Sequence, residues 1–160
     1  MDDLTDNSEG YHTNFCIGVS GYPEKHFEAP NMEIDLRYLK EKIEAGADYI
    51  VTQMFFNNQK YFDFVDAVRA AGIDVPIVPG LKPITKLYQL NSIPRLFYID
   101  LPDDLVKGVT AAKDAEARRQ VGIEWCIAQS KELKERGVPC LHYYTMGDSS
   151  TIQTIAKAVF

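Results

Sequence analysis

The residues that could carry chemistry gather in segment 21–31, which reads Gly-Tyr-Pro-Glu-Lys-His-Phe-Glu-Ala-Pro-Asn. Tyr22, Glu24 and His26 bring a phenol, a carboxylate and an imidazole close together in the chain. The two prolines of the segment lack an amide hydrogen and fix the backbone φ angle, so they stiffen the loop at both ends. Such a loop could hold its polar side chains at defined angles toward a ligand. The same residues are equally compatible with a tight turn whose histidine and glutamates are merely solvated.

The loop lies between a predicted strand and a predicted helix. The apolar run near 13–20, with the letters T-N-F-C-I-G-V-S, favours a buried strand. Apolar residues then recur at helical spacing over 33–45, and Gly46 stands where that helix would end. Because α/β proteins place ligand-binding residues on strand-to-helix loops, segment 21–31 is the first candidate site.

The same alternation continues along the chain. Nearly continuous apolar runs predict three more strands, near 48–56, 75–81 and 138–146. Helical patterns follow the second, third and fourth strands, at 59–71, 84–92, 101–109, 114–136 and 149–160. Four βα units in sequence predict an α/β fold with a parallel sheet and right-handed crossovers. The pattern alone leaves two architectures open: a four-stranded doubly wound domain, or part of a (β/α)8 TIM barrel.

Composition limits the classes of protein and partner. A chain of 160 residues that is 46% hydrophobic and 25% charged is typical of one globular domain, which we expect over 12–160 after a polar tail at 1–11. The net charge of -6, with scattered basic residues, argues against a nucleic-acid partner. No run approaches the ~20 apolar residues that span a bilayer, and the acidic start has no secretory signal, so we expect no membrane association.

Cysteine usage indicates the redox compartment. The chain has three cysteines, Cys16, Cys126 and Cys140, which are far apart in the sequence and have apolar neighbours. This pattern predicts reduced, buried thiols in a cytoplasmic protein, with neither a disulfide framework nor a metal site.

Five motifs occur in a fixed order along the chain. They are G-Y-P-E-K-H-F-E-A-P at 21–30, D-x-x-x-L-K-x-K at 35–42, A-G-A-D-x-I-x-T-Q-x-F-F at 45–56, P-G-L-x-P-I at 79–84 and L-H-Y-Y-T-M at 141–146. In this order and spacing they resemble methylenetetrahydrofolate reductase over nearly the whole chain. The resemblance implies that the chain supplies about four βα units of a TIM barrel, the C-terminal half of that family's catalytic domain.

The resemblance also implies an activity. The family reduces 5,10-methylenetetrahydrofolate to 5-methyltetrahydrofolate with FAD as cofactor and NAD(P)H as co-substrate, a step of one-carbon metabolism and methionine biosynthesis. By resemblance, Tyr22 and His26 contact FAD from the loop. Asp35 and Lys42 reach it from the following helix, where their i to i+7 spacing puts them on one face, the acid suited to a ribose hydroxyl and the amine to a phosphate.

The folate residues follow in the same way. Gln53 matches a family glutamine that contacts the pterin and the nicotinamide in turn, and Gln89 matches a second glutamine of the folate site. Without the resemblance, Gln89 would be interpreted as an exposed amide on a helix surface. The resemblance assigns no catalytic residue to this half, because the family's general acid and the aspartate that tunes the flavin lie in the other half.

Two residues call for a separate interpretation. At the position of Asp148 the family often presents an arginine that pairs with the folate's glutamate tail, and an acid there would repel that carboxylate. His142, on a strand among apolar neighbours, is interpreted as a core histidine rather than a catalyst.

Alternative hypotheses concern the function as a whole. One is a non-catalytic FAD-binding or interaction fragment, and another is a compact four-stranded binding module. For a half barrel we expect unpaired strand edges at 15–20 and 141–145, and therefore either a homo-oligomer or pairing with the missing N-terminal half.

Overall fold

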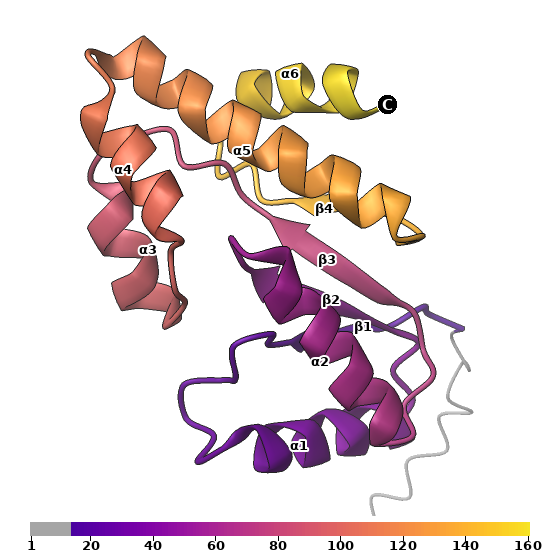
Figure 1. Cartoon of the computed structure of the whole chain (residues 1–160). Coiled ribbons are helices and arrows are strands. Elements are labelled where there is room, and N and C mark those ends of the chain that lie inside the picture. Colours follow the sequence, from indigo (N-terminus) through magenta and orange to yellow (C-terminus); the bar gives the residue numbers. More distant parts are fainter. Residues whose placement is uncertain (1–13) are drawn as a thin grey trace, which may run out of the picture.

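The computed structural model describes residues 14–160, which form a parallel sheet flanked by helices (Figure 1). The strands are β1 (Gly18–Gly21), β2 (Tyr49–Met54), β3 (Ile77–Leu81) and β4 (His142–Tyr143). The helices are α1 (Met32–Glu44), α2 (Asn58–Ala70), α3 (Gln89–Phe97), α4 (Asp103–Ala111), α5 (Ala115–Glu135) and α6 (Ser149–Val159). The predicted tail at 1–11 lies outside the described residues, so the domain boundary near residue 12 stays a prediction.

The strand order is β1-β2-β3-β4, and every neighbouring pair is parallel. The predicted α/β fold with four strands in sequence order is therefore confirmed. β1 and β4 are the two edges of the sheet, at the places where the sequence predicts unpaired strands. Four parallel strands do not by themselves establish a closed (β/α)8 barrel.

All four strands are shorter than the apolar runs predict, and β4 pairs over only two residues. The proline before β3 and the one before β4, Pro76 and Pro139, cannot donate to the ladder. At the start of β1, the amide of Ile17 donates to the side chain of Asp48 over 2.7 Å, so a side chain replaces the regular ladder partner. At these strand ends, the length of the strand depends on which backbone amides can donate to the ladder, and not on the hydrophobicity of the run.

Capping side chains define four of the helices. Asn31, Asn57, Asp114 and Asp148 accept hydrogen bonds from backbone amides at the starts of α1, α2, α5 and α6. These four helices begin and end within two residues of their predicted positions. The sequence carries their boundaries because a cap and an apolar stripe are local signals.

α3 is where the helix prediction is wrong, because the helix begins at Gln89 rather than near residue 84. The side-chain oxygen of Gln89 accepts hydrogen bonds from the amides of Thr85 and Lys86 over 2.8 and 2.9 Å, which holds the preceding segment in a loop. Tyr98, with φ of 54°, then ends the helix in the left-handed conformation.

One core lies between the sheet and four of the helices. Ile50, Ile77 and Leu81 pack together with buried residues of α1, α2, α5 and α6 in a single cluster. Ile50 and Ile77 are register partners, so these helices cover the same face of the sheet. A doubly wound domain would instead place helices on both faces. The other two helices, α3 and α4, pack with Met54 and Phe56 in a second cluster, which Tyr144 also contacts, so the structure leaves both predicted architectures open.

The opposite face of the sheet is open. Val51 and Val78 are register partners on that face and are only partly buried, as is Tyr144, while His142 is exposed. The interpretation of His142 as a core histidine is therefore wrong; its ring lies edge-on to Tyr144, with centroids 4.6 Å apart. Its position on an edge strand of an uncovered face explains the difference.

The cysteines are free, but only Cys126 is buried, so the prediction of three buried thiols is wrong for Cys16 and Cys140. Both exposed cysteines precede edge strands, where one side has no neighbour. Within residues 14–160, no group of side chains is arranged to hold a metal ion, and no helix is both long and apolar enough to cross a membrane.

Candidate functional site

A cavity of about 370 Å3 lies between the loop after β1 and the helix α1. Its lining includes every residue that the sequence assigned to the cofactor: Tyr22, His26, Asp35 and Lys42. Glu28, Ala29 and Tyr38 complete the wall. The loop and one face of α1 therefore meet at one site, as the i to i+7 spacing in the helix predicts.

Lys25 holds the loop in shape. Its backbone is left-handed, with φ of 73°, and its ammonium group turns back to donate to the carbonyls of His26 and Ala29 over 2.9 and 2.6 Å. The side chain of Asn31 then caps α1 by accepting from the amide of Ile34. These contacts fix the loop against the first turn of the helix and use only backbone atoms of His26 and Ala29, so the imidazole of His26 stays available to the cavity.

Asp35 joins the loop to the helix. One of its oxygens accepts from the amide of His26 over 2.8 Å, and the imidazole of His26 lies edge-on to Tyr22 with centroids 4.6 Å apart. The other oxygen of Asp35 remains a possible acceptor for a ligand. Within the described part of the chain, the ammonium of Lys42 makes no ion pair. The cavity thus offers an acceptor, a cation and aromatic edges.

Glu24 anchors the loop to Lys60 and Asp100 and is not among the residues that line the cavity. Its side chain is 8% exposed and lies 3.7 Å from the ammonium of Lys60, and it accepts from the amide of Asp100 over 3.1 Å. Burial raises the pKa of Glu24 above the usual value of a glutamate. Of the three chemical groups that the loop presents in the sequence, this carboxylate is therefore structural.

A second, smaller cavity of about 130 Å3 lies beyond the ends of β3 and β4. Gln89 lines it, and this residue is 9% exposed, so the interpretation as an exposed surface amide is wrong. Its oxygen is occupied by the two loop amides described above, which leaves the amide nitrogen for another partner. Lys82, Lys86 and Asp148 are the charged residues of this lining.

Gln53 is not brought into either cavity. It lies on β2, partly buried, and its side-chain oxygen accepts from the neighbouring amide of Met54 over 2.9 Å. Gln53 lies in the part of β2 where the register with β3 shifts, between Val51 and Met54. The two predicted folate residues are therefore separate within the described chain.

Asp148 has a local role that the sequence did not predict. Its carboxylate accepts hydrogen bonds from the hydroxyl of Thr151, the hydroxyl of Ser150 and the amide of Thr151, and these lower the pKa of Asp148 to about 2. The acid is therefore the cap of α6 as well as a charge beside the second cavity.

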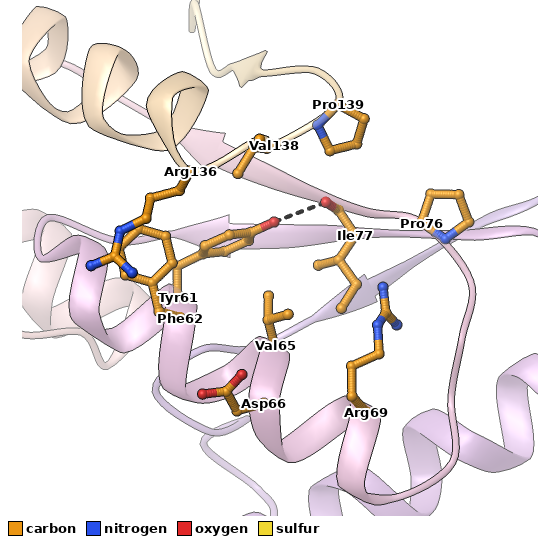
Figure 2. Close-up of a pocket in the computed structure, with 11 residues that line it drawn as sticks. Tyr61, Phe62, Val65, Asp66, Arg69, Pro76, Ile77, Arg136, Val138 and Pro139 are labelled. Atoms are coloured by element: carbon orange, nitrogen blue, oxygen red, sulfur yellow. Dashed lines mark hydrogen bonds between the residues drawn. The ribbon is translucent and has the colours of Figure 1, made fainter.

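A third cavity of about 330 Å3 lies at the opposite end of the strands, between α2 and the end of α5 (Figure 2). The hydroxyl of Tyr61 donates to the carbonyl of Ile77 over 2.9 Å, and burial raises the pKa of Tyr61 to about 12. Arg69 donates to the carbonyl of Ile73, and Arg136 lies over the ring of Phe62. Both arginines are thus engaged in structural contacts, and no residue predicted for the site is here.

Sequence reasoning missed Lys25 and Lys82. A lysine with positive φ has no signature in a single sequence, although its place between two prolines is unusual. Lys82 could have been selected from the sequence, because it is a charged residue directly after the apolar run 75–81.

Comparison with known proteins identifies the family. The family model described as methylenetetrahydrofolate reductase matches residues 5–159. The chain belongs to the methylenetetrahydrofolate reductase family. Methylenetetrahydrofolate reductase 2 of Saccharomyces cerevisiae is 41% identical over 140 residues, which cover 85% of this chain and 23% of that protein. The 5,10-methylenetetrahydrofolate reductase of Escherichia coli strain K12 is 36% identical over 134 residues, covering 83% of this chain and 45% of that protein.

The chain therefore spans about a quarter of its yeast relative in the methylenetetrahydrofolate reductase family and less than half of its bacterial one. Among solved structures, a protein from Clostridium thermocellum that binds two copies of 5-methyl-5,6,7,8-tetrahydrofolic acid matches with a TM-score of 0.59. It is 20% identical, and the match covers 89% of this chain and 52% of that one. This likeness supports the α/β fold alone.

Proposed function

We propose that the complete protein reduces 5,10-methylenetetrahydrofolate to 5-methyltetrahydrofolate, with FAD as cofactor and NAD(P)H as the source of the hydride. Family membership supports the reaction. The observation that carries the cofactor assignment is the first cavity, where Tyr22, His26, Asp35 and Lys42 meet. When bound, flavin supplies the hydride chemistry, for which amino-acid side chains have no equivalent.

The donor set of the first cavity fits the polar part of a dinucleotide. Within residues 14–160, Lys42 has no ion pair and can offer its cation to a phosphate, and the second oxygen of Asp35 can accept from a ribose hydroxyl. Tyr22 and His26 present ring edges beside them. Because Lys25 and Asn31 fix this loop, binding would cost little ordering of the backbone.

For the fold, we propose that the sheet is part of a (β/α)8 barrel whose remaining strands cover the open face. Four helices on one face, partly exposed residues on the other and short edge strands favour closure by further strands. The exposed thiols Cys16 and Cys140 favour a reducing compartment such as the cytoplasm.

The barrel proposal predicts the behaviour of residues 1–160 in isolation. We expect them to self-associate or to be marginally stable, because the uncovered face and the two edges would be available to a second copy. Sedimentation equilibrium combined with thermal unfolding measures both properties. A stable, cooperatively unfolding monomer would show that four strands suffice, and the barrel proposal would be abandoned.

The two glutamines predict different kinetic effects. In the complete protein, Gln53→Ala should slow both flavin reduction by NAD(P)H and flavin reoxidation by methylenetetrahydrofolate, because one amide would serve both ligands in turn. Gln89→Ala should slow only the folate half-reaction. Because each truncation removes a hydrogen bond worth about 1 kcal/mol, the rate of each affected half-reaction should fall at least about fivefold.

The experiment measures the two half-reactions separately by stopped-flow absorbance. Gln59→Ala, an exposed amide on α2, is the matched control and should change neither rate. A Gln89→Ala variant that is slow only in reduction by NAD(P)H would contradict the role proposed for that residue. A complete protein that catalyses neither half-reaction would contradict the proposed function.

A further inference from the structure

The end of β2 carries one residue more than the strand beside it. Val51 pairs with Val78 in the regular register of the sheet. Met54 then pairs with Gly80, so three residues along β2 match two along β3. An extra residue of this kind is a β-bulge, and bulges are common next to active sites, where they re-aim a side chain. Gln53, to which the proposed function assigns both ligands, lies inside this bulge.

Side chains take the hydrogen bonds that a regular ladder would make at this point. Continuing the register of Val51 would pair the amide of Gly80 with the backbone carbonyl of Thr52. Instead, the amide of Gly80 donates to the hydroxyl of Thr52 over 2.9 Å. The carbonyl of Thr52 accepts from the hydroxyl of Tyr144 over 3.0 Å. The two side chains therefore replace the regular ladder contacts next to Gln53.

The conformation of Gln53 depends on the same irregularity. In the regular register, the amide of Met54 would donate across the ladder to the carbonyl of Gly80. In the bulge it donates to the side-chain oxygen of Gln53 over 2.9 Å, which fixes the orientation of that side-chain amide. Restoring the regular register would therefore remove the contact that orients Gln53.

The surroundings of Thr52 make its hydroxyl decisive. Thr52 is 0% exposed and Gly80 is buried, so water does not compete for the amide of Gly80. A Cβ atom at Gly80 would overlap the carbonyl oxygen of Thr52, so this carbonyl already lies against the glycine. Without the hydroxyl, the buried amide would need another acceptor, and that adjacent carbonyl is the one that the regular ladder uses.

We propose that Thr52 is a positioning residue for the reaction, because its hydroxyl stabilises the bulge that orients the amide of Gln53. This inference rests on the proposed function, which assigns methylenetetrahydrofolate and NAD(P)H to that amide. Tyr144, directly after β4, assists by holding the carbonyl of Thr52 away from the ladder.

The test measures both half-reactions of the complete protein by stopped-flow absorbance. Thr52→Val keeps the shape of the side chain without the hydroxyl and should slow both half-reactions about fivefold, as Gln53→Ala does. Thr52→Ser keeps the hydroxyl and should restore most of both rates. In a protein that already carries Gln53→Ala, Thr52→Val should slow neither half-reaction further, because its effect passes through that amide. FAD affinity should be unchanged, since the first cavity is built from other segments.

Thr154→Val is the matched control, because it also removes a hydroxyl that is bonded to a backbone carbonyl, but on α6, and it should change neither rate. If Thr52→Val does not fold, the same comparison with Tyr144→Phe, which removes only the phenol hydroxyl, decides.

The inference alone is overturned if Thr52→Val reacts at the wild-type rates, or if it slows the Gln53→Ala protein by as much as it slows wild type. Rates that Gln53→Ala leaves unchanged would remove the role of Gln53, and the inference with it, while the reaction stands. Wild-type protein that catalyses neither half-reaction overturns the proposed function itself.

Discussion

Gly122→Ala is expected to destabilise the protein by about 3 kcal/mol, the upper end of the usual cost of overpacking a core. A Cβ atom at this position of α5 would overlap the carbonyl oxygen and carbon of Ile84. Both atoms belong to the backbone and cannot rotate away as a side chain would. The helix and the segment after β3 would have to separate, which would also disturb Gln89 and Lys82.

Urea unfolding of wild type and variant measures this effect directly. Gly108→Ala in α4 is the matched control, because its Cβ would meet only a side-chain methyl group of Val121 at 3.1 Å. There the gain in helix propensity, up to about 1 kcal/mol, offsets the contact. If Gly122→Ala unfolds at the wild-type urea concentration, α5 does not cross the Ile84 backbone as closely as described.

The second large effect is expected on flavin affinity. Lys42→Ala should weaken FAD binding by the complete protein at least about tenfold, because a charged contact is worth roughly 1.5 to 3 kcal/mol. Asp35→Ala should also weaken it, because it removes the carboxylate that accepts from the backbone amide of His26. His26→Ala keeps that amide but removes the imidazole that lines the cavity, so it should weaken FAD binding as well. FAD titration followed by flavin fluorescence gives the constants.

Two further variants test whether the charge of Asp35 and the position of Lys42 on α1 matter for FAD binding. Asp35→Asn keeps an oxygen that can accept from the amide of His26 but removes the negative charge, so it should retain more affinity than Asp35→Ala. Lys40→Ala removes a cation from the same helix, but Lys40 donates to the carbonyl of Ala71 outside the cavity. It should leave FAD binding unchanged. Unaltered affinity in the alanine variants of His26, Asp35 and Lys42 would refute the cofactor assignment.

The parts of the fold that could be predicted from the sequence depend on local signals. The boundaries of α1, α2, α5 and α6 follow from caps and apolar stripes, and the meeting of His26 with Asp35 follows from a short loop joined to one helix face. The parallel order of the strands follows from the alternation of elements.

What could not be predicted depends on contacts between distant segments. Strand ends depend on which backbone amides find partners, as at Ile17 and Asp48, and hydrophobicity alone does not report this. The start of α3 depends on how the side chain of Gln89 satisfies two amides. The burial of Lys82 depends on the approach of α6 to the end of β3, which no pattern in either segment specifies.

The central claim is that the cavity between segment 21–31 and α1 is a flavin site, and the visible absorbance spectrum of the purified complete protein tests it most directly. The account predicts that the protein is yellow as isolated or takes up added FAD at one site per chain, and that Lys42→Ala lowers the bound fraction while Lys40→Ala does not. A folded wild-type protein that stays colourless in excess FAD would contradict it.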